Sequence, residues 1–347
     1  MIEGGVEKHC ESLYPLMGND VSLTVYRRKP FVTEPGRYPN IRFVDLPSTK
    51  IKGVEAFLHS FLATVHALFS KPDVVHYHNI GPALFCPLLK FRKIAVVLTF
   101  HSPNYEHDKW GRFAKGLLRF SEKIALNAAD KIIFVNRFQM EKYEAKIRVK
   151  SVFIPNGVKT PLIPENDNYL REIGVTKGKY VLNVGRITPE KGFDTLIHAF
   201  KKAKPNGYKL VVAGGVKFET AYMDWLKTIG DDEDIIFTGN VFGDSLAQLY
   251  ANAGLYVLSS NNEGFPIVLL EAMSYGLDVV VTDIPATRLF DLDENDYVAV
   301  GNADQMAEKI AQRLQHVASR KYDLSQYDWK TITDSVVALY AQACLRK

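Results

Sequence analysis

Two cations in the second half of the chain lie between an apolar run and the start of a helical pattern. Arg186 and Lys191 follow the strand-like run 181–184, and the helical pattern begins after Gly192. A cation directly before a helix is disfavoured, because the helix dipole presents partial positive charge there. Phosphate is the natural anion for such a place. We therefore predict that Arg186 and Lys191 bind phosphate, the alternative being two solvated surface cations.

A second stretch contains two acidic side chains, Glu263 and Glu271, eight positions apart. The run 255–258 before them reads as a buried strand, and Pro266 and Gly276 suit the start and the end of a helix. This helix is apolar on nearly every side, so the Glu271 carboxylate needs a partner such as the hydroxyls of a ribose. The alternative is that Glu263 caps the helix and Glu271 reaches an exposed edge. Together the two stretches predict a pocket for a nucleotide diphosphate sugar.

These two stretches resemble the motifs of a known enzyme family. Glu263 and Glu271 match the Glu-x7-Glu motif of retaining glycosyltransferases with the GT-B fold, and residues 185–192 match their phosphate-binding loop. The likeness runs from Gly4 to the C-terminus through Gly4-Gly5, His101 and Ile154-Pro155-Asn156-Gly157. The chain thus resembles glycosyltransferase family 4, a group that builds bacterial polysaccharides and glycolipids.

The resemblance implies a catalytic set and a donor-binding set. The catalytic set is Arg186, Lys191, Glu263 and His101. The donor-binding set is Gly4, Gly5, Gly185, Asn156, Gly214, Gly264, Phe265, Pro266, Ile267 and Glu271. The two cations would stabilise the leaving diphosphate, so no metal and no cofactor other than the nucleoside diphosphate sugar is expected. His101 would orient the donor sugar, the alternative being a hydrogen-bonded structural histidine.

Strand-length apolar runs alternate with helix-period segments, which indicates parallel sheets. The predicted strands are residues 21–26, 41–46, 74–78, 94–100, 131–135, 152–154, 180–184, 210–213, 235–238, 255–258, 279–282 and 297–300. With the resemblance, this pattern predicts an α/β protein of the GT-B fold, with two doubly wound Rossmann-like domains facing across a cleft. The expected parts are an acceptor-side domain (1–157), a nucleotide-sugar domain (158–327) and a helix that crosses back to the first domain (328–347).

The start of the chain departs from the family pattern. Relatives begin with an apolar strand that leads into Gly-Gly, whereas this chain begins almost at Gly4. That strand is central in a doubly wound sheet, so its absence leaves neighbouring backbone groups and apolar faces unpartnered. Either the natural N-terminus is longer or this domain is compromised, and we favour a truncated or misassigned start.

Length and composition are typical of a soluble two-domain protein. The chain has 347 residues, 47% of them hydrophobic and 24% charged. The scattered cysteines Cys10, Cys86 and Cys344 indicate a reducing compartment without a disulfide framework, and a cytoplasmic protein is expected. No apolar segment is long enough for a bilayer, and residues 1–5 lack the features of a signal peptide. A net charge of +4 is too small for a nucleic-acid-binding protein.

Residues 109–124 predict a basic amphipathic helix. Its cations are Lys109, Arg112, Lys115, Arg119 and Lys123, opposite Trp110, Phe113, Leu117, Leu118 and Ile124. Such a helix can rest on an anionic membrane surface, which would suit an enzyme with a lipid-linked acceptor. The alternative is a packing helix with a solvated basic face.

The predicted function is transfer of a hexosyl unit from a nucleoside diphosphate sugar to a glycan or lipid-linked acceptor, with retention, in bacterial cell-surface polysaccharide biosynthesis. A metal-dependent hydrolase is an alternative, because His76, His78 and the pair His107-Asp108 are potential ligands. A sugar-nucleotide epimerase or phosphorylase of the same fold would also fit the sequence, as would an inactive relative that only binds the donor.

Overall fold

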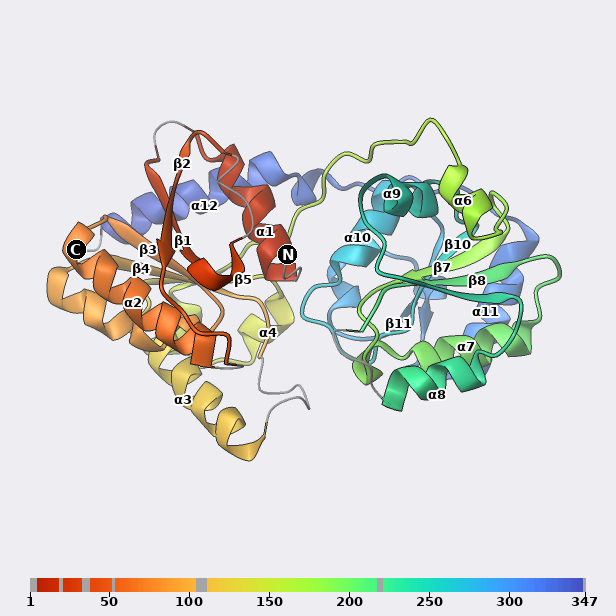
Figure 1. The fold of residues 1–347 in the computed structure, drawn as a ribbon, viewed down its shortest axis with the longest axis horizontal. Coiled ribbons are helices and arrows are strands. Elements are labelled where there is room, and N and C mark those ends of the chain that lie inside the picture. Colours follow the sequence, from red (N-terminus) through yellow and green to blue (C-terminus); the bar gives the residue numbers. More distant parts are fainter. Residues whose placement is uncertain are drawn as a thin grey trace. The chain divides into compact units, whose positions relative to one another are not determined.

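The computed structural model describes residues 5–18, 21–32, 38–51, 54–103, 111–216 and 221–345. The chain divides into two compact units, which are shown in Figure 1. The first unit comprises Met1–Gly157 together with Gln326–Lys347, and the second comprises Val158–Ser325. Each unit has a parallel β-sheet with helices packed against it, so the predicted α/β class is confirmed.

The strands of the first unit form two separate parallel sheets. The larger sheet has the order β3 (Val74–His78), β4 (Ala95–Phe100), β5 (Lys131–Phe134) and β6 (Ser151–Phe153). The smaller sheet pairs β1 (Leu23–Arg28) with β2 (Ile41–Leu46). A doubly wound sheet of the order 3-2-1-4-5-6 has one more strand between the positions of β1 and β3. Within the described residues the ladder is therefore divided at the position of the central strand.

The helices of the first unit cover both faces of the larger sheet. They are α1 (Gly5–Leu13), α2 (Val54–Ser70), α3 (Arg112–Ala128), α4 (Arg137–Glu141), α5 (Ala145–Arg148) and α12 (Trp329–Cys344), with shorter helical turns such as η3 (Pro82–Arg92). Side chains alternate across β4: Val96 and Leu98 pack with α3 and η3, whereas Ala95 and Val97 pack with α1 and α12. The final helix of the chain thus completes the core of the first unit.

The second unit contains one six-stranded parallel sheet of the order β9-β8-β7-β10-β11-β12. Its strands are β7 (Tyr180–Val184), β8 (Lys209–Ala213), β9 (Ile235–Gly239), β10 (Leu255–Leu258), β11 (Val279–Thr282) and β12 (Tyr297–Val298). Its helices are α6 (Asn168–Glu172), α7 (Phe193–Ala203), α8 (Ala221–Ile229), α9 (Gly243–Asn252), α10 (Ile267–Ser274) and α11 (Ala303–Gln315). Every side chain of β10 and β11 is buried, as expected for strands covered on both faces.

Two buried aspartates form ion pairs at the edge of this sheet that contains β11 and β12. Asp296 is fully buried and accepts hydrogen bonds from Arg313 and Arg320, at 2.7 and 2.8 Å. Asp278, before β11, accepts from the same two arginines at 3.1 Å. Each buried charge is therefore paired, which is the condition for burying it without a large penalty.

The predicted strands agree with the described strands to within two residues at each end. Among the described residues, no helix combines the length and the apolar character needed to span a membrane.

Candidate functional site

Both predicted phosphate and sugar loops follow strands at the centre of the second sheet. When the six strands of this unit are numbered along the chain from β7 to β12, their order across the sheet is 3-2-1-4-5-6. The direction of winding therefore reverses between β7 and β10. Ligands of such sheets bind beyond the carboxyl ends of the strands at this switch point. The loop 185–192 follows β7 and the loop 259–266 follows β10. The topology thus brings the two motifs to one location.

Gly192 allows the first loop to approach the second. Its φ is +61°, and a Cβ atom on it would lie 2.2 Å from the carbonyl oxygen of Ser259. Glycine is the residue that combines this backbone conformation with such a close approach. The hydroxyl of Ser259 donates to the carbonyl oxygen of Lys191 at 2.9 Å, and the backbone N–H of Asn261 donates to that of Glu190 at 2.8 Å. The two loops therefore form one connected structure.

Lys191 and Glu263 form an ion pair between the Lys191 Nζ and the Glu263 Oε1 atoms. The same carboxylate oxygen accepts a hydrogen bond of 2.8 Å from the hydroxyl of Ser260. Glu263 does not cap helix α10, which begins without a side-chain cap. Glu263 is thus an anion beside Lys191, the cation for which the sequence predicted phosphate. The pairing was not predicted, because the two residues are 72 positions apart.

Arg186, the other predicted cation, is exposed. Among the residues that the structure describes, it has no ion pair and no side-chain hydrogen bond. Its guanidinium group is thus accessible to a ligand of the loop.

Glu271 lies on α10, on a face that is only partly covered. Ile267, Val268 and Glu271 are half-buried, and no residue of this helix is exposed, so the helix is covered on every side but less completely around Glu271. Glu271 accepts a hydrogen bond of 3.1 Å from the hydroxyl of Tyr250, a partner that the sequence did not reveal. A carboxylate has further lone pairs, so this contact leaves Glu271 able to accept from a ribose.

Tyr256 places a buried hydroxyl close to both glutamates. The side chain is fully buried, and its oxygen has no hydrogen-bond partner among the described residues. Burial raises the pKa of Tyr256 well above its usual value, and the charges of Glu263 and Glu271 raise it further. The hydroxyl therefore stays protonated and remains a hydrogen-bond donor.

The predicted donor-binding residues of this unit gather around the two loops. A Cβ atom on Gly214 would lie 1.8 Å from the carbonyl oxygen of Gly185, so these two glycines are in direct backbone contact. Phe265 is buried and its ring lies edge-on to Phe290, with centroids 5.3 Å apart. Gly264 precedes it, Pro266 is the N-cap of α10 and Ile267 is the first residue of that helix.

The predicted site residues of the first unit surround a cluster of histidines. His101 follows β4, is buried, and lies 3.1 Å through its Nε2 atom from Nδ1 of His78. His9, on α1, stacks edge-on against His101 with ring centroids 4.9 Å apart. The Nδ1–H of His9 donates to the side-chain oxygen of Asn156 at 2.7 Å. Asn156 is thus a structural partner of α1 in this state.

Two further residues of the prediction lie at the edges of this cluster. Gly5 is the first residue of α1, one helical turn before His9, and Gly4 lies outside the described residues. His9 was missed by the sequence prediction, although the spacing of four between Gly5 and His9 places both on one face of a helix. His107 and Asp108 also lie outside the described residues.

Burial keeps the imidazoles of this cluster uncharged. It lowers the pKa of His9 to about 4 and that of His76 to about 3. It also lowers the pKa of His78 and of His101 well below the usual value, and the neighbouring histidines lower both further. Neutral imidazole both donates and accepts hydrogen bonds, so the cluster can form a connected network at pH 7.

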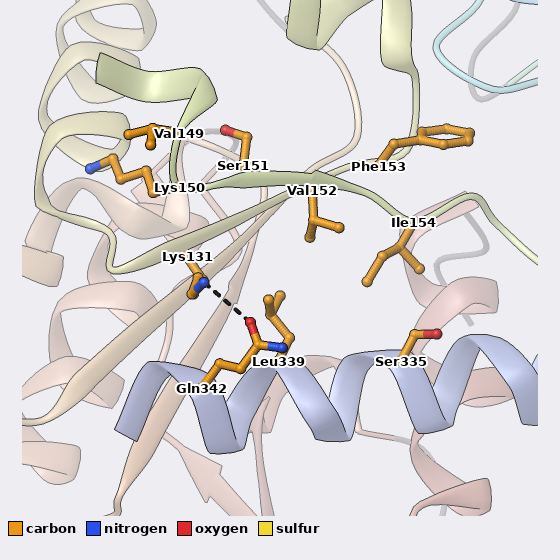
Figure 2. Close-up of a pocket in the computed structure, with 10 residues that line it drawn as sticks. All are labelled: Lys131, Val149, Lys150, Ser151, Val152, Phe153, Ile154, Ser335, Leu339 and Gln342. Carbon is orange, nitrogen blue, oxygen red and sulfur yellow. Dashed lines mark hydrogen bonds between the residues drawn. The ribbon is translucent and has the colours of Figure 1, made fainter. Parts of the chain in front are cut away.

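A hollow of about 320 Å³ lies elsewhere on the first unit, along β6 and α12, and is drawn in Figure 2. Lys131 and Gln342 face each other across it, with the Lys131 Nζ donating to the amide oxygen at 3.2 Å. Lys150 donates to two backbone carbonyl oxygens at 2.8 Å. The residues that line this hollow include none of the predicted site residues, so it is a separate feature.

Comparisons with known proteins agree with this architecture. Residues 166–324 match the family described as Glycosyl transferases group 1, and residues 3–161 match the family described as Glycosyltransferase Family 4. A phosphatidyl-myo-inositol mannosyltransferase of Mycolicibacterium smegmatis is 31% identical, with the alignment covering 98% of this chain and 90% of that protein. The uncharacterized glycosyltransferase MJ1607 of Methanocaldococcus jannaschii is 32% identical, but only 51% of this chain and 48% of that protein align.

Among solved structures, the Alr3699/HepE protein of Anabaena in complex with UDP-glucose is similar with a TM-score of 0.76. The sequence identity is 16%, and the match covers 98% of this chain and 96% of that chain. A likeness at this level of identity establishes a common fold.

Proposed function

This chain belongs to glycosyltransferase family 4 and is a glycosyltransferase of the GT-B fold, and on that basis we propose which reaction it performs. The reaction is transfer of a hexosyl unit from a nucleoside diphosphate sugar to a hydroxyl group of a glycan or lipid-linked acceptor, with retention of the anomeric configuration. The observation that carries the proposal is the Lys191–Glu263 pair, which joins the phosphate loop to the sugar loop at the switch point of the sheet.

Lys191 is suited to the diphosphate of the donor. Its ammonium group has three N–H donors, of which the carboxylate of Glu263 takes one. The others can reach phosphate oxygens, and the exposed Arg186 adds a second positive charge from the same loop. Cations that already face the leaving group stabilise its growing negative charge, so the transfer requires no divalent metal.

Glu263 and Glu271 are suited to the two sugars of the donor. Lys191 and Ser260 hold Glu263 through its Oε1 atom, and we assign its Oε2 atom to the hydroxyls of the transferred hexose. Glu271 is half-buried and held by Tyr250, so we assign it to the ribose hydroxyls. Hydrogen bonds to a charged acceptor are stronger than those between neutral groups.

We assign Glu263 to binding of the sugar hydroxyls, and the mechanism we propose uses no enzymatic nucleophile. We propose that the acceptor hydroxyl attacks the anomeric carbon from the face of the leaving group. Its proton passes to the departing phosphate oxygen, and the bond between that oxygen and the anomeric carbon breaks. The product then has the configuration of the donor.

The test is a panel of UDP-, GDP-, dTDP- and ADP-sugars, with release of the nucleoside diphosphate as the readout and EDTA present throughout. UDP-sugars come first, because the Anabaena protein of the same fold was solved with UDP-glucose. Lys191→Ala is expected to lower turnover about 100-fold or more. The matched control is Lys202→Ala. Lys202 lies on α7, the helix after the loop, and among the residues that the structure describes its only ion pair is the exposed one with Asp304.

The outcomes separate binding from catalysis. Binding of nucleotide by calorimetry without turnover of any donor would identify an inactive relative. Near-normal turnover of Lys191→Ala would remove this residue from the mechanism, and a product of inverted configuration by NMR would exclude the retaining reaction.

We further propose that α3 brings the enzyme to a membrane that carries the acceptor. Leu117 and Phe120 are 41% and 58% exposed, beside the exposed cations Arg119 and Lys123. Exposed apolar side chains flanked by cations suit an anionic lipid surface. The name of the mycobacterial relative, a phosphatidyl-myo-inositol mannosyltransferase, supports a lipid acceptor. Trp110 and Lys109 of the predicted helix lie outside the described residues.

Liposome flotation tests this assignment. Wild-type protein is expected to float with vesicles that contain phosphatidylglycerol at low salt and to dissociate at high salt. Leu117→Ser/Phe120→Ser should abolish flotation, whereas Lys201→Ser/Lys202→Ser on α7 should not. Absence of binding at low salt would exclude a membrane-binding role for α3.

A further inference from the structure

The histidine cluster of the first unit has the geometry of a metal site. His9 comes from α1, His78 from the end of β3, and His101 from the residue that follows β4. Each offers one ring nitrogen, and the three nitrogens lie within 4.8 Å of one another. Three imidazoles that converge from three separate elements are the protein ligands of many zinc sites with an open fourth position.

The spacing of the nitrogens is close to what one ion requires. Two nitrogens, each about 2.0–2.1 Å from a tetrahedral zinc ion, lie about 3.4 Å apart. Nδ1 of His78 and Nε2 of His101 are 3.1 Å apart. The separations that involve His9 are at most 4.8 Å, so rotation of its side chain has to bring the third nitrogen to the same ion.

The nitrogens on the far side of two of these rings are already held. The Nδ1–H of His9 donates to Asn156, which leaves the Nε2 lone pair of His9 directed away from that contact. The Nε2 atom of His78 lies at the hydroxyl of Tyr14, which leaves its Nδ1 atom facing His101. Hydrogen bonds of this kind fix the tautomer and orientation of metal-binding histidines.

The fourth histidine of the cluster is not a ligand. Nδ1 of His76 is bonded to the hydroxyl of Tyr340 at 2.6 Å, and its Nε2 atom is bonded to that of Thr99 at 2.7 Å. Both nitrogens of His76 are thus occupied. The sequence had paired His76 with His78 as potential ligands, whereas the structure selects His9, His78 and His101.

We propose that His9, His78 and His101 bind one Zn²⁺ ion, with a water molecule or an anionic oxygen at the fourth position. For this, His78 carries its proton on Nε2, where it donates to the Tyr14 oxygen, and His101 carries its proton on Nδ1. The facing Nδ1 atom of His78 and Nε2 atom of His101 then both have a free lone pair for the ion. Imidazole nitrogens favour zinc and the neighbouring late first-row metals. The ion joins α1 to the ends of β3 and β4.

Metal binding to the untagged full-length chain tests the site. Protein stripped with EDTA and then desalted is titrated with Co²⁺, which is followed by visible absorption, and with Zn²⁺, which is followed by calorimetry. The expected results are one ion per chain and the intense bands of four-coordinate Co²⁺, without the near-ultraviolet band of a cobalt–thiolate bond. His9→Gln and His101→Gln should each weaken zinc binding about 100-fold or more. His198→Gln, at an exposed position on α7, is the matched control and should bind like the wild type.

Three outcomes would overturn the proposal. They are a six-coordinate Co²⁺ spectrum of the wild type, a thiolate band from the neighbouring Cys10, and equal zinc affinity of the His101→Gln and His198→Gln variants. The spectrum of the wild type decides the question even if a substituted protein fails to fold.

Discussion

Acidification from pH 7 to pH 5 is expected to destabilise the first unit by about 4 kcal/mol through two histidines, His9 and His76. Burial lowers the pKa of His9 to about 4 and that of His76 to about 3. In the unfolded chain both titrate near pH 6.5. The unfolded state therefore binds more protons below pH 6.5, so the contribution to stability is present above that pH and is lost as the pH falls toward 4.

The size of this change in unfolding free energy follows from the difference between the histidine pKa in the unfolded state and the pH. At pH 5 the unfolded-state pKa exceeds the pH by about 1.5 units. Since one unit corresponds to about 1.4 kcal/mol, each histidine that is held neutral in the folded state lowers the unfolding free energy by about 2 kcal/mol. At pH 7 the same loss is close to zero. His9 and His76 together give the 4 kcal/mol. His78 and His101 act in the same direction, because burial lowers their pKa as well.

The assay is urea unfolding at pH 7 and pH 5, with EDTA present to exclude metal binding. Tryptophan fluorescence is measured in a Trp225→Phe background, because Trp225 belongs to the second unit and is 44% exposed. The remaining tryptophans, Trp110 and Trp329, belong to the first unit. His9→Gln keeps an amide that can donate to Asn156 but cannot titrate.

The measured quantity is the difference in unfolding free energy between the two pH values. His9→Gln is expected to reduce this difference by about 2 kcal/mol, whereas His198→Gln, which removes an exposed histidine, should leave it unchanged. An equal pH dependence in both variants would refute the reasoning, since it would show that His9 is not held neutral by the fold.

Three further substitutions test other contacts. Gly214→Ala directs a Cβ atom into the carbonyl oxygen of Gly185, and should lower stability by about 2 kcal/mol and weaken UDP binding, measured by urea unfolding and calorimetry. Asp296→Ala removes one of the two aspartates that Arg313 and Arg320 share, while Asp278 remains paired with both. It should lower the unfolding free energy by about 1.5–3 kcal/mol, measured in the same way, and a loss below 1 kcal/mol would contradict the pairing argument. Glu271→Gln keeps an acceptor for Tyr250 but removes the charge, and should weaken nucleotide affinity about 10-fold at unchanged stability. Unaltered affinity would exclude the ribose assignment.

The fold could be predicted because its strands are nearly continuous apolar runs between helical patterns. The errors lie at strand ends, where local hydrogen bonds to a side chain or within a turn replace the ladder. β12 was expected to extend to residue 300 but ends at Val298, because the backbone N–H of Ala299 donates to the side-chain oxygen of Gln305 at 2.7 Å. β1 was expected from residue 21, where Val21 instead closes a turn with Gly18. A residue pattern does not reveal such local competition.

The candidate site could be predicted only where its signals are local. Each loop was found from a strand, a turn and a helix that follow one another in the sequence. The contact between Lys191 and Glu263 depends on β10 lying next to β7, a long-range order that periodicity does not fix. For the same reason His9 was missed, because its partners His78 and His101 belong to β3 and to the end of β4. Spatial proximity of distant residues is information that only the topology supplies.

The course of the chain makes the second unit an insertion into the first. Residues 158–325 form one uninterrupted segment, whereas the first unit is assembled from Met1–Gly157 and Gln326–Lys347. Trp329, Ile332 and Val336 of α12 belong to the core beside β4, so the first unit is incomplete until α12 has been synthesised. On the ribosome, the middle of the chain can therefore fold before its beginning does. A stop codon before the codons of α12 would damage the sheet that is encoded first.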